Sequence, residues 1–292
     1  MNTLIIGASG KIGKSFINYK SKKFIFTYNS SKINQGIKFN IIYDNIEEII
    51  KKNNINSVVI MSAISDPDYC KKYQKKSNLI NVIKTKELIN KLIKLKIYFI
   101  FFSTEFVYDG LKGYYSEKDK TNPISVYGKQ KLKIENFIKR KTNNFAIFRI
   151  AKTYSDNMSD NTIISNFMKI SKKKTEIYAA TDQIFSPLYA KDIVRIVKYF
   201  SKEKIKGLFN VGGPEAYSRY SILKKFEKIF ERKKIIIKAK IFKTSIDKFK
   251  FYELRAKNVS FNTSKIEKAI NFKLSRIERI LIKTLNEKFK RR

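Results

Sequence analysis

The fold is decided near the N-terminus, by the stretch Thr3-Leu4-Ile5-Ile6-Gly7-Ala8-Ser9-Gly10-Lys11-Ile12-Gly13. Its first four residues predict a short apolar strand, and the amphipathic segment 11–19 predicts a helix directly after the glycines. A glycine-rich turn between a strand and a helix presents free backbone N–H groups to the pyrophosphate of a dinucleotide. The three glycines would allow a tight turn, a close approach to the pyrophosphate, and close packing of helix on strand. The alternative is a purely structural turn.

Strands and helices alternate through the first half of the chain. Further apolar strands are predicted at 24–28, 37–42, 57–61, 97–102 and 145–150, and helices at 46–52, 77–94 and 124–140. This alternation predicts an α/β fold, a Rossmann-type doubly wound parallel sheet. Beyond residue 150 the alternation weakens, and helices are predicted at 161–173, 190–201, 218–231 and 275–290. We expect a dinucleotide-binding Rossmann domain over 1–154 and a smaller C-terminal mixed α/β substrate-binding part over 155–292, with some of its segments returning to the Rossmann core.

The composition excludes several kinds of chemistry. The 292 residues include no histidine and one cysteine, Cys70. The usual zinc ligand sets, Ser-His or Cys-His catalysis and an intramolecular disulfide therefore cannot be assembled, and no metal site is predicted. No apolar run is long enough to cross a bilayer, and the chain enters its first strand without a secretion signal. We expect a cytoplasmic protein with no membrane partner.

The charge is strongly positive, with 63 Lys and Arg against 25 Asp and Glu and a net charge of +38. Such a charge can indicate a nucleic-acid partner. Here the lysines are spread along the chain and accompanied by abundant Ile, Asn, Phe and Tyr, which is the amino-acid usage of an A/T-rich genome. We therefore predict no nucleic-acid partner, although the positive field can attract anionic substrates.

The cofactor prediction depends on the ends of the second and third strands. An Asp or Glu after the second strand would select NAD by accepting from the ribose 2′-hydroxyl. The chain instead reads Tyr28-Asn29-Ser30-Ser31-Lys32, whose polar groups suit a 2′-phosphate unless they are ordinary loop residues. NADPH is therefore predicted, with NADH as the alternative. Asp44 is expected near the adenine, or as the cap of the helix that begins at Ile46.

Tyr127 and Lys131 are the candidate catalytic pair, because a separation of four residues places them on one helix face. The spacing alone indicates little, since six tyrosines have a lysine four residues further on: Tyr19, Tyr28, Tyr108, Tyr114, Tyr127 and Tyr220. The surroundings distinguish Tyr127, because Ser103 and Thr104 end a buried strand upstream and Asn122-Pro123 precedes the helix. The carboxyl ends of parallel strands face the ligand crevice, so we expect Ser103 and Thr104 at the nicotinamide.

These residue types suit the reduction of a carbonyl group. A carbonyl that receives hydride at carbon must receive a proton at oxygen, and a tyrosine with a pKa near ~10 needs its phenolate stabilised to serve. Lys131 would supply that positive charge and hold the nicotinamide ribose. Thr104 would orient the carbonyl oxygen. The alternative is a packing aromatic residue and a solvated lysine.

Further motifs stand in order along the chain: the GxxGxxG loop, 62–70, Asn81, 103–110, 123–131, Phe148-Arg149, 182–192, 207–214, Arg255 and 258–265. With them the sequence resembles the dTDP-4-dehydrorhamnose reductase family of extended short-chain dehydrogenases/reductases. The resemblance implies NADPH-dependent reduction of the 4-keto group of a nucleotide-linked 6-deoxy sugar, with Thr104, Tyr127 and Lys131 as the catalytic set. The implied cofactor-binding residues are Gly7, Ser9, Gly10, Lys11, Ile12, Gly13, Asn29, Ser30, Lys32, Asp44, Ser62, Ala63, Ser103, Tyr127 and Lys131. The implied substrate-binding residues are Thr104, Glu105, Lys152 and Arg255.

The sequence also departs from that family on the substrate side. Glu105 stands where the family usually has Asp, Ala256 replaces a common proline, and Lys152 stands where rhamnose-forming members carry a tryptophan. An ammonium cannot stack on a deoxy sugar as an indole does, but it can pair with a carboxylate, phosphate or hydroxyl. We therefore expect reductase chemistry on a sugar more polar than the rhamnose precursor.

Two other functions stay open at this point. A sugar-nucleotide epimerase or dehydratase would use the same Tyr–Lys pair and recycle a tightly bound cofactor. A non-catalytic NADP-binding subunit, like the regulatory subunit of methionine adenosyltransferase, resembles the same family. The expected partner is a nucleotide-sugar substrate, and a homodimer is left open.

Overall fold

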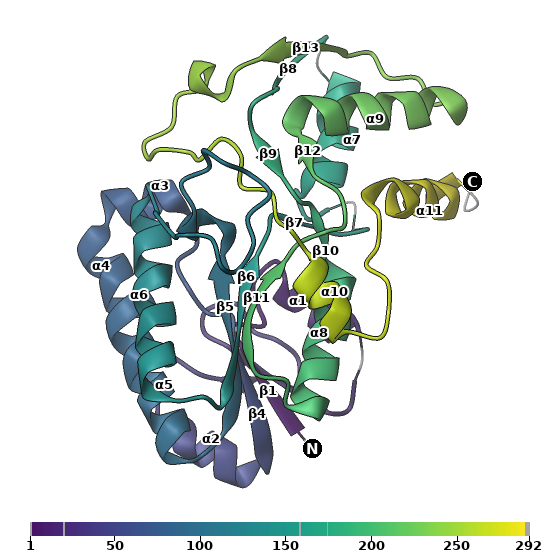
Figure 1. Cartoon of the computed structure of the whole chain (residues 1–292). Coiled ribbons are helices and arrows are strands. Elements are labelled where there is room, and N and C mark those ends of the chain that lie inside the picture. The colour runs from purple at the N-terminus through teal and green to yellow at the C-terminus, as the bar shows by residue number, and fades with distance from the viewer. Residues whose placement is uncertain (1, 20, 158, 174, 290–292) are drawn as a thin grey trace.

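A seven-stranded parallel sheet forms the centre of the protein in the computed structural model, which describes residues 2–19, 21–157, 159–173 and 175–289 (Figure 1). The strand order is β11-β6-β5-β4-β1-β2-β3. The strands are β1 (Asn2–Ile6), β2 (Phe24–Tyr28), β3 (Ile37–Lys38), β4 (Ile55–Ile60), β5 (Tyr98–Thr104), β6 (Phe145–Ile150) and β11 (Gly207–Val211). The order reverses beside β1, as in doubly wound sheets, so the predicted fold class is confirmed.

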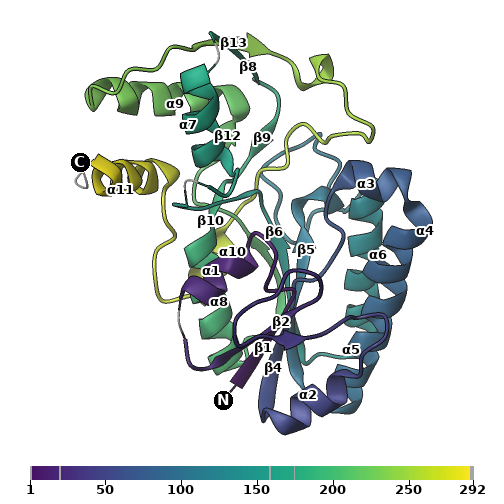
Figure 2. The ribbon, with the colours of Figure 1, turned by 180° about the vertical axis from the view of Figure 1, so that it is seen from behind.

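Helices cover both faces of this sheet, because its strands are apolar on both sides (Figures 1 and 2). Phe99 and Phe101 of β5 pack with one helical layer, and Ile100 and Phe102 with the other, as the period of two residues in a strand requires. The first layer contains α2 (Ile46–Lys52), α5 (Thr85–Lys94) and α6 (Val126–Lys141). The second contains α1 (Gly13–Asn18), α8 (Ala190–Glu203) and α10 (Ser264–Ala269).

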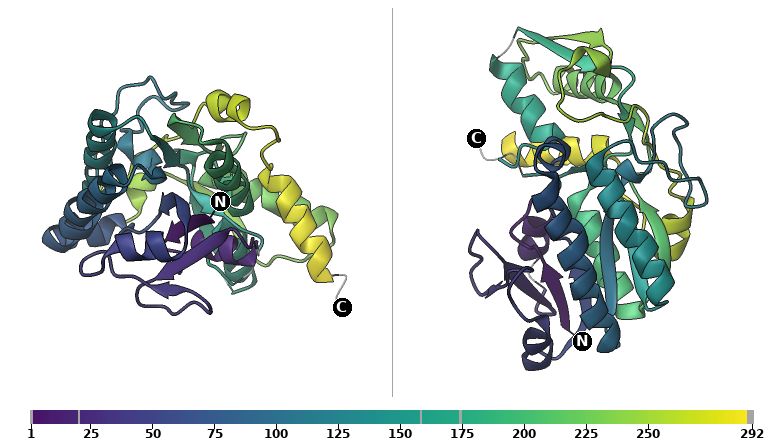
Figure 3. Two further views of the ribbon diagram at one scale, coloured as in Figure 1. Left: turned by 90° about the horizontal axis from the view of Figure 1, so that it is seen from below. Right: turned by 90° about the vertical axis from the view of Figure 1, so that its left-hand side faces the viewer.

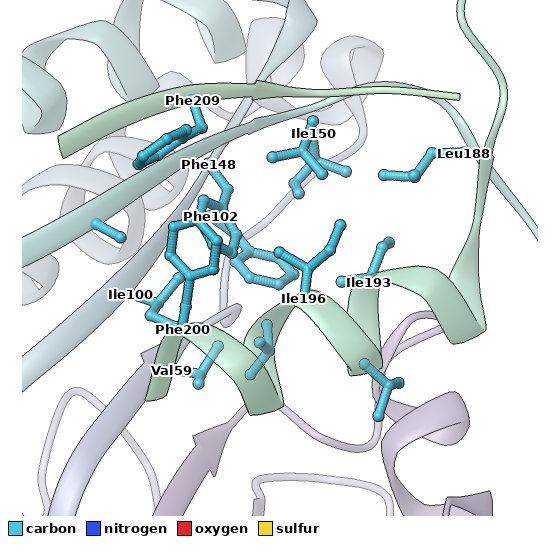
Figure 4. Packing of buried hydrophobic residues seen from close by; sticks show 14 of the residues in the cluster. Val59, Ile100, Phe102, Phe148, Ile150, Leu188, Ile193, Ile196, Phe200 and Phe209 are labelled. Carbon is cyan, nitrogen blue, oxygen red and sulfur yellow. The ribbon is translucent and has the colours of Figure 1, made fainter. Parts of the chain in front are cut away.

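Segments from the second half of the chain complete the sheet layer. Strand β11 pairs with β6, and Figure 4 shows Ile196 and Phe200 of α8 packed against Phe102 and Phe148 of the sheet. The T-shaped contact of Phe148 with Phe200 has a centroid distance of 4.9 Å. A boundary at residue 154 stays a prediction.

A smaller part with its own apolar core stands over the carboxyl ends of the sheet strands (Figures 1 and 3). Its core is formed mainly by α7 (Ile163–Lys173), α9 (Arg219–Arg232) and α11 (Ile277–Phe289), where Phe167 contacts Phe226 and Phe230. Its elements are β7 (Thr153–Tyr154), α7 (Ile163–Lys173), β8 (Glu176–Ala180), β9 (Ile184–Phe185), β10 (Leu188–Tyr189), β12 (Tyr217–Ser218), α9 (Arg219–Arg232), β13 (Lys240–Thr244), η3 (Ile246–Lys248) and α11 (Ile277–Phe289). The short pairs are β10 with β7, β12 with β9, and β13 with β8.

Some element boundaries differ from prediction. The strand expected at 37–42 ends at Lys38, because Asn40 starts a turn: its side chain accepts from Ile42 N, and its own N–H donates to the Asp44 carboxylate. The helix expected at 77–94 is divided into α4 (Gln74–Asn78), the π-helix η1 (Leu79–Lys84) and α5. The short elements α3 (Pro67–Lys72) and η2 (Glu105–Val107) were not predicted. The predicted helix end at Lys290 lies outside the described residues.

Across the part of the chain that the structure describes, no helix is both long enough and apolar enough to span a membrane.

Candidate active site

The glycine loop after β1 has a backbone that larger residues would not fit. Gly7 has φ +90°, and a Cβ there would lie 2.8 Å from the backbone N of Ser62. A Cβ at Gly13 would lie 2.1 Å from the carbonyl oxygen of Ala8, so α1 begins in close contact with the loop. Between them, Ser9, Gly10, Lys11 and Ile12 form a turn that is partly or fully open to solvent. The loop is therefore shaped for a ligand that contacts backbone.

An orphaned hydroxyl beside this loop supports a dinucleotide site. The Oγ of Ser62 is buried and has no hydrogen-bond partner among the described residues. The segment that follows, which includes Ala63, is held by Asn81 of the π-helix η1: its Oδ1 accepts from Ile64 N at 2.8 Å, and its Nδ2 donates to Ile64 O at 2.9 Å. Buried polar groups in folded proteins are normally paired. The Ser62 hydroxyl next to Gly7 therefore fits a cofactor that supplies the missing partner.

The residues predicted at the adenosine end lie on the surface beyond β2 and β3. Asn29, Ser30 and Lys32 are exposed in the loop after β2. Asp44 is also exposed, and its carboxylate accepts from Asn40 N at 2.6 Å. The alternative in which Asp44 caps the next helix is wrong, because the cap of α2 is Asn45, whose side chain accepts from Glu47 N. An adenine contact for Asp44 stays a prediction.

Tyr127 lies in the first turn of α6, where a glycine brings the helix against the end of β5. A Cβ at Gly128 would lie 2.1 Å from the carbonyl oxygen of Phe106, so only glycine allows this approach. The helix starts at Val126, two residues later than predicted, because Ser125 caps it by accepting from Gly128 N. The Tyr127 ring meets Phe106 edge to face at 6.4 Å. Tyr127 and Thr104 are thus held on two closely packed elements.

Lys131 is buried one turn below Tyr127 on α6. Its Nζ donates to the carbonyl oxygen of Phe102 at 2.7 Å and lies 5.9 Å from the centroid of the Tyr127 ring. Burial lowers the pKa of Lys131 to about 7. Burial also raises the pKa of Tyr127, with smaller contributions from Cys70 and Glu105. An ammonium has three donors, so two remain for other partners.

The hydroxyl of Ser103 is engaged in a buried ion pair. Neighbouring strand residues face opposite sides of a sheet, and Ser103 Oγ donates to Glu135 Oε1 at 2.5 Å. Glu135 also binds Arg149, whose Nη2 lies 2.7 Å from Oε2. Any cofactor contact of Ser103 is therefore left to its backbone. Glu135 was not predicted from the sequence, although it follows Lys131 by four residues, just as Lys131 follows Tyr127 by four.

Glu105 and Lys152 come together on the substrate side. Glu105 is buried, and its Oε2 accepts from the backbone N of Lys152 at 3.1 Å. Burial raises the pKa of Glu105 to about 7, against the opposing charges of Lys152 and Arg219. Arg255 lies near enough to lower the pKa of Lys152, while its own guanidinium is 2.8 Å from Asp68 Oδ2. Sequence reasoning missed Arg219, because nothing local indicates which way the start of that helix faces.

The burial of Glu105 predicts a pH-dependent cost to stability. Its pKa is raised from 4.5 to about 7, so between these pH values the native state holds a proton that the unfolded state has released. Stability must then fall as the pH rises through that window. Glu105→Gln removes the titration and keeps an acceptor for Lys152 N. We therefore expect the melting temperature of Glu105→Gln minus that of the unaltered protein to increase as the pH rises from 4.5 to about 7.

The control is Glu48→Gln, which removes an exposed carboxylate on α2. Its melting temperature is expected to follow that of the unaltered protein across the same range. A constant difference between Glu105→Gln and the unaltered protein at every pH would contradict the assignment.

The fold, the glycine loop and the buried Tyr–Lys pair define a Rossmann-type, nicotinamide-dependent oxidoreductase of the extended short-chain dehydrogenase/reductase kind. The sequence matches the family described as the RmlD substrate binding domain over residues 1–289. The chain belongs to this family, and the resemblance to dTDP-4-dehydrorhamnose reductases is confirmed.

Two relatives show how widely the family has diverged. The spore coat polysaccharide biosynthesis protein SpsK of Bacillus subtilis (strain 168) is 30% identical over 166 residues, which span 56% of this chain and 57% of that protein. The methionine adenosyltransferase 2 subunit beta of Xenopus tropicalis is 22% identical over 230 residues, 75% of this chain and 69% of that protein.

Two solved structures share the fold over almost the whole chain. A hypothetical dTDP-4-dehydrorhamnose reductase from Sulfolobus tokodaii has a TM-score of 0.82 and 25% identity, covering 96% of this chain and 99% of that one. The dTDP-4-dehydrorhamnose reductase from Bacillus anthracis in complex with NADP also has a TM-score of 0.82, with 21% identity, and covers 98% of this chain and 100% of that one.

Proposed function

We propose that the protein is an NADPH-dependent reductase of a nucleotide-linked keto sugar, with 4-keto-6-deoxy sugars as the class implied by its relatives. The observation that carries the proposal is the packing of α6 on the end of β5. It holds Tyr127, Lys131 and Thr104 at the carboxyl edge of the sheet, where doubly wound folds bind their ligands. The glycine loop of the same edge is shaped for a dinucleotide.

Each residue has a role that its contacts support. The nicotinamide, when bound, supplies the hydride. Backbone N–H groups of 11–13 bind the pyrophosphate, since those of Gly7, Ala8 and Gly10 already donate within the protein. Ser62 Oγ gains its missing partner, and the two free donors of Lys131 hold ribose hydroxyls. Thr104 Oγ1 accepts from Phe106 N at 3.3 Å, which leaves its O–H to orient the carbonyl oxygen of the sugar. Tyr127 then gives that oxygen its proton.

In the proposed mechanism, Lys131 supports the charge of Tyr127 only once the ligands are bound. In the protein alone burial dominates the pKa of both groups, raising that of Tyr127 and lowering that of Lys131. We propose that ribose and substrate oxygens fix the ammonium beside the phenol in the ternary complex. NADPH is the proposed cofactor, because Asn29, Ser30 and Lys32 after β2 bring no carboxylate to the 2′-position.

NADPH oxidation across a panel of nucleotide-linked 4-keto sugars tests the function. A reductase consumes one NADPH for each sugar reduced. An epimerase or dehydratase returns its hydride and consumes none in net, so turnover of sugar without loss of NADPH absorbance would overturn the proposal.

A non-catalytic subunit is the second candidate, favoured by the similarity to methionine adenosyltransferase 2 subunit beta. Such a protein would bind NADPH without oxidising it in the presence of any sugar of the panel. The retained Thr104, Tyr127 and Lys131 favour the enzyme. A cytoplasmic location, a homodimer and the lack of a nucleic-acid partner all stay predictions.

A further inference from the structure

Two cations meet beside the proposed position of the reacting carbonyl. Thr104 is paired in register with Ile150 of β6, so Lys152 follows only two residues beyond the strand neighbour of Thr104. Its backbone N–H binds Glu105, the residue after Thr104. Lys152 is exposed as a whole residue, whereas its ammonium lies against the buried Phe185 ring and is desolvated there.

Arg219 reaches the same place from the smaller part of the protein. Strands β9 and β12 lie side by side above the sheet (Figure 1), with Phe185 opposite Tyr217. The guanidinium carbon of Arg219 lies 5.4 Å from the centroid of the Phe185 ring, and Lys152 Nζ lies 5.8 Å from it. The Arg219 side chain is fixed by Gln183, whose Oε1 accepts from Nε at 2.9 Å.

These cations are poorly compensated by the protein. Among the described residues, neither Lys152 nor Arg219 has a carboxylate within 4.0 Å. Desolvation lowers the pKa of Lys152 to about 7, and the nearby charge of Arg219 lowers it further, while Glu105 opposes the shift. Lys11 and Arg255 add to the positive field. Since like charges at close range repel, an anion between them would be strongly stabilised.

We propose that Lys152 and Arg219 bind a carboxylate attached to the ring carbon that neighbours the reacting carbon of the sugar. The substrates would then be acidic sugar nucleotides. This inference rests on the proposed reductase function. In the inferred substrates, an anionic carboxylate stands where a 6-deoxy sugar has its apolar methyl group. A guanidinium offers two parallel N–H donors that match a carboxylate. The pair adjoins Thr104 and Glu105, whereas the substrate pyrophosphate must lie beyond the sugar ring. Both cations lie within 5.8 Å of the centroid of the Phe185 ring.

The test compares UDP-glucuronic acid with UDP-glucose, which share nucleotide and pyrophosphate and differ by one carboxylate. Binding of each to the NADP⁺-saturated full chain is measured calorimetrically at 150 mM salt. We expect the acidic sugar to bind about tenfold more tightly, as for a charge-assisted pair. Lys152→Met and Arg219→Gln should each lower the affinity for UDP-glucuronic acid more than the affinity for UDP-glucose, so that the ratio of the two affinities comes close to one. Arg219→Lys, which keeps the charge, should retain most of the preference.

Matched controls come from α8, where Arg195 lies over the Phe272 ring and Lys198 over the Tyr19 ring. Arg195→Gln and Lys198→Met should leave the ratio unchanged. Equal affinities for both sugars in the unaltered protein would overturn the carboxylate site alone, and NADPH oxidation with neutral 4-keto sugars would still support the reductase. A parallel loss of both affinities in Arg219→Gln would assign Arg219 to the pyrophosphate and also overturn the site. If neither sugar binds, the carboxylate site is overturned, and NADPH oxidation across the panel of 4-keto sugars decides the proposed function separately.

Discussion

Tyr127→Phe is expected to lower kcat by about 10²- to 10⁴-fold, the usual contribution of a positioned general acid. The substitution removes only the phenolic oxygen. The ring keeps its edge-to-face contact with Phe106, and Gly128 keeps α6 against η2. The fold and the dissociation constant for NADPH should therefore be unchanged. The measurements are NADPH oxidation at saturating sugar, NADPH binding by fluorescence, and the melting temperature.

Tyr114→Phe is the matched control for this variant. Tyr114 also has a lysine four residues on, but its side chain is 64% exposed and lies off α6. Its kcat should equal that of the unaltered protein. Full activity in Tyr127→Phe, or an equal loss in Tyr114→Phe, would contradict the site and favour the non-catalytic candidate.

The sheet could be predicted because its signals are local. The central strands are mainly apolar, and the apolar residues of β5 alternate between two helical layers without any change in character. The glycine loop was readable because its pattern lies within the first strand–helix unit, where Gly13 meets Ala8, although the contact that requires Gly7 is with Ser62 after the neighbouring strand β4. The wrong end of β3 comes from a turn that the apolar pattern does not reveal. The side chain and the N–H of Asn40 form hydrogen bonds that end β3 early, although the sequence remains apolar at Ile41 and Ile42.

The candidate site was only partly predictable, because several of its contacts join segments far apart in the chain. Tyr127 and Lys131 share a helix, so their spacing was visible. Arg219 reaches Phe185 through the pairing of β12 with β9, which no local pattern encodes. The direction of the Ser103 side chain follows from strand alternation, yet its partner Glu135 is 32 residues away.

Arg149→Met is expected to lower the free energy of unfolding by about 3 to 5 kcal/mol, the cost of breaking a buried ion pair from one side. Arg149 is 2% exposed and Glu135 is fully buried. Methionine fills much of the space but leaves the carboxylate of Glu135 with Ser103 as its remaining partner. Tyr108 also loses the guanidinium, which donates to its hydroxyl at 2.6 Å, but keeps Ser116 O as an acceptor. Urea unfolding followed by circular dichroism measures the loss.

The double variant Glu135→Gln with Arg149→Met separates charge from packing. If the cost arises from an uncompensated carboxylate, the neutral amide should restore more than half of the lost stability, because it can still accept from Ser103. The surface pair of Lys225 and Glu278, 3.0 Å apart with both side chains about one-third exposed, is the comparison. Lys225→Met should cost less than about 1 kcal/mol. An Arg149→Met loss no greater than that would show that this buried pair contributes no more than one on the surface. A double variant less stable than Arg149→Met would show that the cost does not come from an uncompensated carboxylate.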